Sequence, residues 1–293
     1  METGVEQAVS LNTLQRCRPL LGTFVELDLC AELSDAELLD YSENIYTEIE
    51  RLQNLLSFHD LSSELTQVNQ QLLTASLSQT VSVVISNEFS ETLDFSLSLW
   101  RQSHGVFDVT IAPELIRCKQ LPTHFELDNK VLGNSSHLSL ANNILSASAP
   151  VCIDLGGIAK GYVVDKARSC IPKQLAYCVN AGGDLATNQW QNNLVSLKYA
   201  ARSSAVKTHR MLDACLATSG NYYRAGHSAF ISPVTKKQVK VAGSVSVFAN
   251  SVMTADALTK LAILLPRKHY QLIEKLLNVK TVRLNRFGFS NLH

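Results

Sequence analysis

Two glycines and a lysine stand together where a predicted buried strand turns into a predicted helix. The stretch runs from Ile153 to Tyr162, with Gly156 and Gly157 at the turn and Lys160 in the first helical turn. Glycine lets a backbone approach a ligand closely, and the N-terminus of a helix offers unpaired N–H groups to an anion. Because the ammonium group of Lys160 lies beside them, this turn is a candidate pyrophosphate site. The same pattern also suits a tight turn that binds nothing.

The common nucleotide-binding patterns do not describe this stretch. The chain contains no GxxxxGK[ST] motif, and the third glycine has the wrong spacing for a dinucleotide-binding fingerprint. A second glycine pair, Gly182 and Gly183, ends the next predicted strand. Two glycine-rich strand ends in succession indicate one shared cleft.

A third segment, from Met253 to Lys260, carries charged residues at helical spacing. Asp256 and Lys260 stand at positions i and i+4 of a predicted helix, so their side chains share one face. Taken alone, such a pair is an ordinary surface ion pair that contributes only about 0.3–0.5 kcal/mol.

The composition argues against several classes of protein. Lys plus Arg and Asp plus Glu number 26 each in 293 residues, so no net field would attract nucleic acid or an anionic membrane. The seven cysteines never form a CxxC pair, which argues against a zinc site or a disulfide framework. No window reaches the roughly 18 apolar residues of a membrane span, and residues 1–16 lack the apolar core of a secretory signal. These features predict a cytoplasmic protein with no nucleic-acid or membrane partner.

The N-terminal half must supply the elements that frame the cleft. Residue alternation predicts a strand over 22–29, and an N-cap at Ser34 or Asp35 starts a helix that ends near Leu56. Further along, Ser62 can cap a short helix through Val68, apolar spacing predicts a helix over 84–101, and the polar stretch 118–150 is predicted to be a short hairpin region.

The central and C-terminal parts alternate strands and helices. We predict a strand over 151–155, a helix over 159–169, a strand over 176–180, strands and turns over 189–247, a helix from about Thr254 to Leu265, and closing strands. The chain shows no repeat and no linker rich in Gly, Pro or Ser. It is therefore predicted to fold as an N-terminal tail, 1–16, and one α+β domain, 17–293, with a mixed-sheet core and flanking helices.

Seven short segments share a pattern that runs in order along most of the chain. They are 18–23, 57–65, 105–110, 154–162, 180–185, 217–222 and 254–259. Together they resemble the FAD:protein FMN transferase family, also called ApbE-like. That family holds FAD in a cleft between two lobes and, with Mg²⁺, transfers FMN to a Thr or Ser of a target protein.

The resemblance implies roles for individual residues. Leu21 stands where the family's flavin-contacting Met-Gly-Thr begins, and His59 stands where a tyrosine usually stacks on the flavin nucleotide. The resemblance implies FAD contacts at these positions and at Val106, Phe107, Asp108, Asp154 and Lys160. It implies metal contacts at Asp256, at Thr259 and at the backbone carbonyl of Gly157.

Two departures from the family's pattern bear on the chemistry. The metal-site threonine four residues after the aspartate is Lys260 here, and an ammonium group at that place is a candidate substitute for the cation. The family's His-Ile-Ile-Asp-Pro is the stretch from Ala229 to Pro233 here, so the histidine and the aspartate are both missing. His227, two residues earlier, could stand in for that histidine, but it also suits a solvated loop position. The catalytic residues are therefore unassigned.

Three functions follow from the resemblance and its departures. The first is an FAD:protein FMN transferase, with FAD, possible Mg²⁺ and a flavin-acceptor protein as its partners. The second is a non-catalytic FAD-binding protein, which the missing histidine and Lys260 favour. The third is an FAD pyrophosphatase that yields FMN and AMP.

Overall fold

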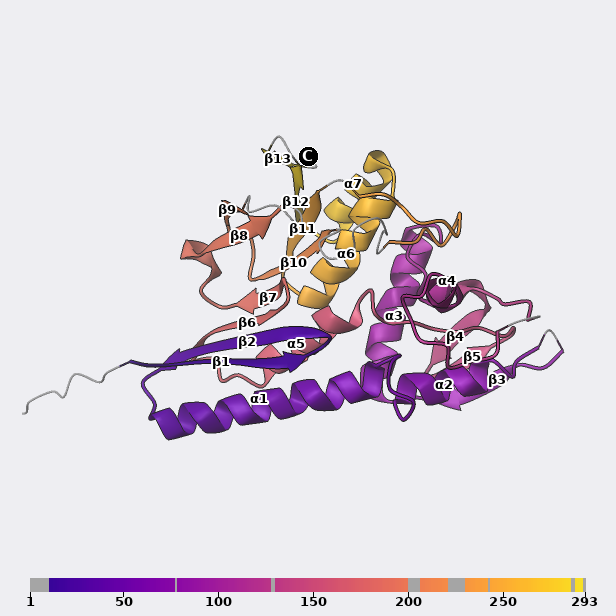
Figure 1. The fold of residues 1–293 in the computed structure, drawn as a ribbon, viewed down its shortest axis with the longest axis horizontal. Coiled ribbons are helices and arrows are strands. Elements are labelled where there is room, and N and C mark those ends of the chain that lie inside the picture. The colour runs from indigo at the N-terminus through magenta and orange to yellow at the C-terminus, as the bar shows by residue number, and fades with distance from the viewer. Residues whose placement is uncertain are drawn as a thin grey trace, which may run out of the picture.

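One antiparallel sheet of eight strands forms the larger part of the molecule (Figure 1). The computed structural model describes residues 11–76, 78–127, 130–199, 206–220, 230–241, 243–285 and 288–291. The strand order is β1-β2-β6-β7-β10-β11-β12-β13. The strands are β1 (Asn12–Leu20), β2 (Thr23–Ala31), β6 (Ala176–Ala181), β7 (Asp184–Thr187), β10 (Cys215–Gly220), β11 (Ser244–Ala249), β12 (Lys280–Asn285) and β13 (Gly288–Asn291).

Helices cover one face of this sheet and a hairpin covers part of the other. Helices α1 (Asp35–Leu56), α5 (Ala159–Ser169) and α6 (Val252–Leu264) pack on strands β1–β2, β6–β7 and β10–β11 in turn. On the other face, β8 (Leu194–Lys198) and β9 (Val206–Arg210) pair with each other and enclose a small second core that includes Leu197, Leu216 and Phe248.

A smaller lobe lies at one end of the sheet (Figure 1). It contains the three-stranded sheet β3-β5-β4, formed by Val81–Val84, Ile144–Ala147 and Leu138–Ala141, and the helices α2 (Glu64–Leu72), α3 (Asn87–Gln102) and α4 (Ala112–Arg117). Helix α7 (Arg267–Leu276) follows α6. One continuous hydrophobic core joins the two lobes.

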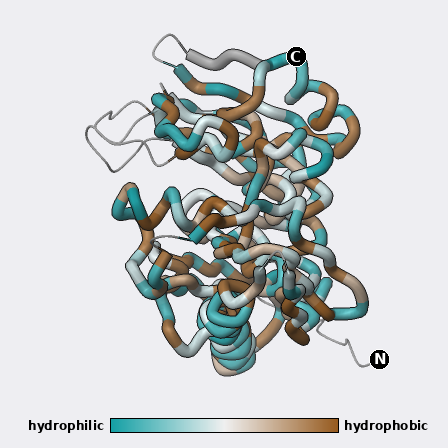
Figure 2. The backbone as a smooth tube through the Cα atoms, turned by 90° about the vertical axis from the view of Figure 1, so that its right-hand side faces the viewer, coloured by the Kyte–Doolittle hydropathy of each residue, from teal (hydrophilic) through white to brown (hydrophobic). Residues whose placement is uncertain are grey.

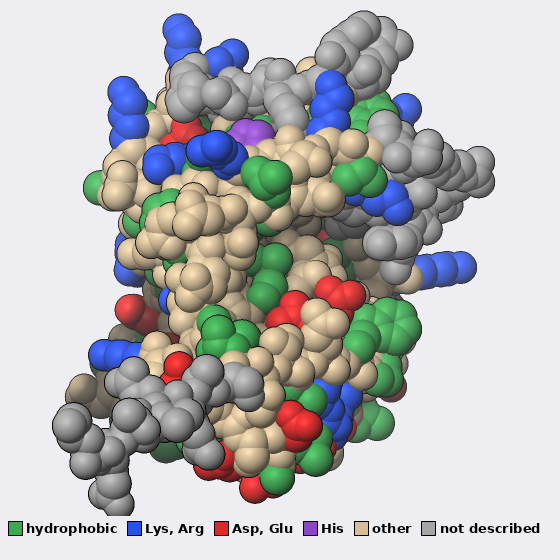
Figure 3. Space-filling model, turned by 90° about the vertical axis from the view of Figure 1, so that its left-hand side faces the viewer, with side chains coloured by type: hydrophobic (Ala, Val, Ile, Leu, Met, Phe, Trp, Pro, Cys, Tyr) green, Lys and Arg blue, Asp and Glu red, His purple; other side chains and the backbone are tan. Residues whose placement is uncertain are grey.

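The hydropathy of the residues along the chain follows this layered arrangement. Figure 2 shows hydrophilic and hydrophobic residues alternating along the tube, as amphipathic elements require. The face drawn in Figure 3 carries lysine and arginine mainly at its upper end and acidic side chains mostly below. No helix within the described residues is both long and apolar enough to cross a membrane.

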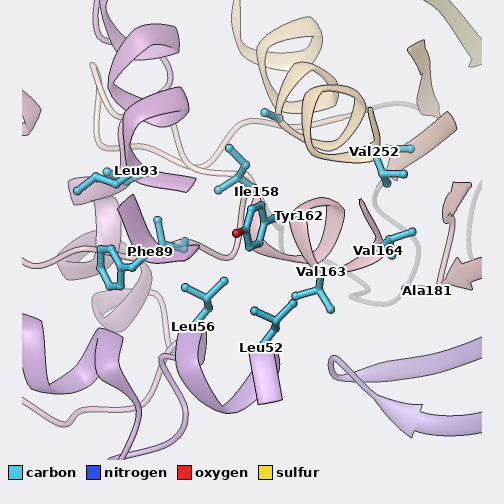
Figure 4. Packing of buried hydrophobic residues seen from close by; sticks show 14 of the residues in the cluster. Leu52, Leu56, Phe89, Leu93, Ile158, Tyr162, Val163, Val164, Ala181 and Val252 are labelled. Atoms are coloured by element: carbon cyan, nitrogen blue, oxygen red, sulfur yellow. The ribbon is translucent and has the colours of Figure 1, made fainter. Parts of the chain in front are cut away.

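Helix α5 packs within the larger lobe and also contacts α3 of the smaller lobe. Its side chains Tyr162 and Val163 point among Leu52 and Leu56 of α1 and Phe89 of α3 (Figure 4), and all five are buried. On its other side, Gly161 lies so close to α6 that an added Cβ would stand 2.5 Å from the carbonyl oxygen of Val252. Glycine at this position therefore allows α5 and α6 to touch backbone to backbone.

The α+β class is confirmed, with a refinement of the sheet: all described strand pairs are antiparallel rather than mixed. The predicted boundary at residue 17 falls inside β1, which begins at Asn12 and pairs along its whole length with β2. The sheet therefore begins earlier than predicted.

Local sequence signals explain which helix ends were predicted well. Helix α1 begins where expected because Ser34 and Glu37 form a capping box, in which the Glu37 carboxylate accepts from the Ser34 amide at 2.9 Å. Helix α5 spans the predicted 159–169. Helix α3 begins at Asn87, not at residue 84, because 81–84 pairs with β5 and Ser86 caps the helix.

The predicted strand over 151–155 is wrong. The segment is buried, but it pairs with no neighbouring strand. The side-chain amide of Asn69 donates to the Ile153 carbonyl at 2.8 Å and accepts from the Ile153 amide at 2.6 Å, and the Asp154 amide donates to the Val109 carbonyl. A buried polar side chain thus satisfies the backbone groups that a sheet would otherwise satisfy.

Candidate functional site

A cavity of about 780 Å³ opens between the two lobes. This volume lies within the range of roughly 300–1,000 Å³ that is typical of small-molecule sites. All seven predicted FAD contacts line it: Leu21, His59, Val106, Phe107, Asp108, Asp154 and Lys160. Of the predicted metal contacts, Gly157 and Lys260 line it too, whereas Asp256 and Thr259 are fully buried behind the wall.

The turn between β1 and β2 brings Leu21 to the cavity. Leu21 and Gly22 both have positive φ, +56° and +67°, the geometry of a tight hairpin turn whose twist suits the strands. Such a φ is costly for leucine. The side-chain oxygen of Gln53 on α1 accepts a hydrogen bond from the Leu21 amide at 2.5 Å, which holds this turn in place.

The segment after α3 brings a second group of residues to the cavity. The Phe107 amide donates to the Ser103 hydroxyl, and Asp108 Oδ1 accepts from the Thr110 amide at 2.9 Å and from the Thr110 and Ser135 hydroxyls. Asp108 therefore anchors the segment that presents Phe107. His59, which follows the end of α1, is exposed and lines the cavity mouth.

Asp154, the fourth residue of segment 151–155, lies at the cavity wall. Burial raises the pKa of its carboxyl to about 6, from an ordinary value near 3.8, although the Gly156 amide partly opposes this by hydrogen bonding to the charged form. The folded protein therefore holds this proton more tightly than the unfolded chain does.

Replacing Asp154 by asparagine is expected to stabilise the ligand-free protein at pH 8. A carboxyl with a raised pKa lowers the free energy of unfolding progressively as the pH rises from about 4 to about 6, and the full penalty applies above that window. A shift of about two units corresponds to roughly 3 kcal/mol. Asp154→Asn removes the ionisation, so urea unfolding should show a gain of that order at pH 8 and almost none at pH 3.5.

A matched control for this prediction is a carboxyl whose pKa is lowered, so that its replacement should change the stability at pH 8 in the opposite direction. The arginines Arg16 and Arg18 hydrogen bond to Glu43 and lower the pKa of its carboxyl. Glu43→Gln should therefore lose stability at pH 8. Destabilisation by Asp154→Asn at pH 8 would contradict the assigned cause.

Lys160 forms a partly buried ion pair that sequence analysis did not assign. Its Nζ contacts Asp184 Oδ2 at the start of β7, and the Asp184 side chain is only 2% exposed. Burial acts to lower the pKa of Lys160, but the carboxylates of Asp184 and Asp256 outweigh it and raise that pKa. Burial, followed by Asp256, raises the pKa of Asp184. In the sequence Asp184 directly follows the second glycine pair, but its pairing with Lys160 is visible only in the structure.

A second ion pair lies beside the first. Lys260 Nζ contacts Asp256 Oδ1 along one face of α6, and the Gly161 amide of α5 donates to Asp256 Oδ2 at 3.3 Å. The Thr259 hydroxyl donates to the Asp256 carbonyl at 2.7 Å and lies 2.6 Å from the Ser219 hydroxyl. Far from being an exposed pair, Asp256 and Lys260 lie at the junction of α5, α6 and β10.

The predicted metal contacts do not fit a divalent cation as they are arranged. Both carboxylate oxygens of Asp256 have protein partners, and one of them is itself a cation. The Thr259 hydroxyl also has two partners. Within the described ranges, three or more His, Cys, Asp or Glu side chains nowhere gather into a set that could hold a metal ion.

The stretch that replaces the family's histidine is described only in part. His227 and Ala229 lie outside the described residues. Phe230 and Ile231 are buried and line the cavity together with Pro233. Among the described residues of the cavity wall, His59 is the one histidine.

Comparison with known proteins agrees with this fold. The sequence profile of the ApbE family matches residues 21–282, whereas no curated protein sequence matches the chain. The structure resembles the flavin transferase ApbE from Vibrio cholerae, with 21% identity, a TM-score of 0.77, and coverage of 96% of this chain and 97% of that one. It also resembles the ApbE protein from Thermotoga maritima, with 19% identity, a TM-score of 0.78, and coverage of 96% and 97%. A third match is the apo form of the flavinyl transferase ApbE from Pseudomonas stutzeri, with 21% identity, a TM-score of 0.75, and coverage of 97% and 95%. Because the family profile spans most of its length, this chain belongs to the ApbE family.

Proposed function

We propose that this protein is an FAD:protein FMN transferase, whose substrates are FAD and a protein that carries an acceptor threonine or serine. The observation that carries the proposal is the shared cavity: Lys260 and the seven residues expected to contact FAD, Lys160 among them, line one space. Family membership supports it, as does the likeness to solved proteins named flavin transferases.

The reaction would break the phosphoanhydride bond of FAD and form a phosphate ester bond to the acceptor. The acceptor hydroxyl oxygen attacks the phosphorus on the FMN side of the pyrophosphate and forms a new P–O bond. The bond from that phosphorus to the bridging oxygen breaks, AMP leaves with the electron pair, and the hydroxyl proton goes to a base that the described residues do not identify. Ammonium groups that face the pyrophosphate would stabilise the charge that builds on the departing oxygen.

FAD is expected to bind more tightly than FMN, because the two lysines are assigned to the pyrophosphate rather than to the flavin ring. A charge-assisted contact contributes about 1.5–3 kcal/mol, so the preference should be roughly tenfold to a hundredfold. Calorimetric titration with each nucleotide measures it. Equal affinities for FAD and FMN would contradict the assignment of the two lysines to the pyrophosphate.

Transfer itself is tested by mass spectrometry of an acceptor. The protein is incubated with FAD and an acceptor peptide that contains threonine, and the mass of the peptide is measured before and after the incubation. An added FMN mass, with AMP released in equal amount, supports the transferase. The same peptide with alanine in place of its threonine is the control and should remain unmodified.

A non-catalytic FAD-binding protein is the second candidate. The pairing of Lys260 with Asp256 favours it, because that arrangement departs from the family's metal site. Bound FAD with neither transfer nor AMP release would identify such a protein, whereas release of AMP and free FMN would identify an FAD pyrophosphatase. A cytoplasmic location stays a prediction from the N-terminal sequence.

A further inference from the structure

Two lysine–aspartate pairs stand side by side in the wall of the cavity. In each pair the lysine faces the cavity and the aspartate lies behind it. The side chains of Lys160 and Lys260 are 35% and 19% exposed, whereas those of Asp184 and Asp256 are 2% and 1% exposed. On this part of the wall a ligand therefore meets the two ammonium groups and not the carboxylates of Asp184 and Asp256.

The charges of these four groups cancel within the protein. Two ammonium groups balance two buried carboxylates, so the set needs no further cation to satisfy Asp256. A divalent ion placed beside Asp256 would lie next to the ammonium group of Lys260. Two neighbouring positive charges repel strongly in a poorly solvated site. The Gly161 amide, which donates to Asp256 Oδ2, occupies the remaining side of that carboxylate.

We propose that Lys260 is the fixed cation of this cavity, and that the protein binds the pyrophosphate of FAD through Lys160 and Lys260 without Mg²⁺. The choice of FAD as ligand rests on the proposed function. A lysine ammonium is a compact charge that binds phosphate well and imposes no octahedral set of oxygen ligands. One lysine thus supplies charge where a metal ion would otherwise be required.

The rival arrangement turns Lys260 toward solvent and gives Asp256 to Mg²⁺. The structure favours the lysine for two reasons. Lys260 follows Asp256 by one helical turn, the spacing at which side chains meet on a helix face. Its stem is also largely enclosed, because α6 packs between α5 and the strands β10 and β11. Removing the ammonium would leave Asp256 charged and buried.

The test is calorimetric titration of FAD in the presence of Mg²⁺ and again in EDTA. The parent protein should bind FAD with nearly the same affinity in both. Lys260→Thr should bind roughly tenfold to a hundredfold more weakly in EDTA and should recover with Mg²⁺, since a hydroxyl oxygen then replaces the ammonium. Lys260→Arg keeps the charge and should stay independent of Mg²⁺. Lys268→Thr, an exposed position on α7, is the matched control and should behave as the parent does.

Thermal unfolding without FAD gives a second readout, in case Lys260→Thr folds poorly. The melting temperature of Lys260→Thr should rise when Mg²⁺ is added, because Asp256 then regains a cation, whereas that of the parent should not change. A melting temperature of the parent that rises with Mg²⁺ would count against the inference.

The titrations also separate this inference from the proposed function. A strong Mg²⁺ requirement in the parent, together with transfer of FMN to the acceptor, would overturn the lysine substitution and keep the transferase. Binding of FAD that survives EDTA, without transfer, would keep the lysine substitution and overturn the transferase. Failure to bind FAD under both conditions would overturn both.

Discussion

Replacing Lys160 by alanine is expected to weaken FAD binding roughly tenfold to a hundredfold, because one of the two ammonium groups that face the pyrophosphate is lost. The same change should lower the free energy of unfolding by about 3 kcal/mol, since it leaves the carboxylate of Asp184 buried and unpaired. This lies at the lower end of the range for a broken buried pair, because Lys160 is itself partly exposed.

The stability loss should depend on pH in a defined direction. Burial already raises the pKa of Asp184, and removing Lys160 removes an attraction that opposes that rise. The unpaired carboxyl can then escape its penalty by binding a proton in acid. The difference in free energy of unfolding between the parent and Lys160→Ala should therefore be larger at pH 8 than at pH 5.

Two further variants separate the structural effect from the binding effect. The double variant Lys160→Ala/Asp184→Asn should recover most of the lost stability at pH 8 but not the affinity for FAD. Lys166 lies on α5 like Lys160, and Lys166→Ala, which removes a partly exposed ion pair with Glu91 of α3, should cost less than about 1 kcal/mol. Normal FAD binding by Lys160→Ala would show that Lys160 is a structural partner of Asp184 and nothing more.

The features that sequence analysis predicted are those with a local cause. The capping box at Ser34 sets the start of α1, and the glycine turn sets the start of α5. The seven residues expected to contact FAD line one cavity. That they contact FAD stays a prediction. Local patterns also placed Asp256 and Lys260 on one helix face.

The features that sequence analysis missed depend on distant partners. Val151–Leu155 is apolar enough for a strand, but nothing in its own sequence shows that Asn69, more than 80 positions away, takes its hydrogen bonds. Helix α7 and the start of β1 were also missed, although the periodicity of β1 is as regular as that of β2. The role of Asp184 appears only when β7 is set beside α5. Long-range pairing decides the cases of segment 151–155 and Asp184, whereas α7 and the start of β1 carry a regular local pattern that could have predicted them.

Replacing Gly161 by alanine is expected to destabilise the protein by about 1–3 kcal/mol or more, the range for overpacking a tight contact. Glycine inside a helix usually costs roughly 0.5–1 kcal/mol relative to alanine, so the ordinary effect of this change would be a gain. Here the new Cβ would lie 2.5 Å from the Val252 carbonyl oxygen and 2.8 Å from the Met253 Cα. Both are backbone atoms at the start of α6, which cannot move aside as a side chain can.

The same change should weaken FAD binding, because relief of the contact requires α5 and α6 to separate. Lys160 lies on α5 and Lys260 on α6, so their separation changes the distance between the two ammonium groups that face the pyrophosphate. It also stretches the hydrogen bond from the Gly161 amide to Asp256 Oδ2. Gly157→Ala is the matched control for stability, because its Cβ would meet nothing closer than the Phe107 ring at 4.0 Å. Urea unfolding and calorimetric titration measure the two effects. A Gly161→Ala variant as stable as the parent, with unchanged affinity for FAD, would show that the close approach of these helices does not set the spacing of the lysines.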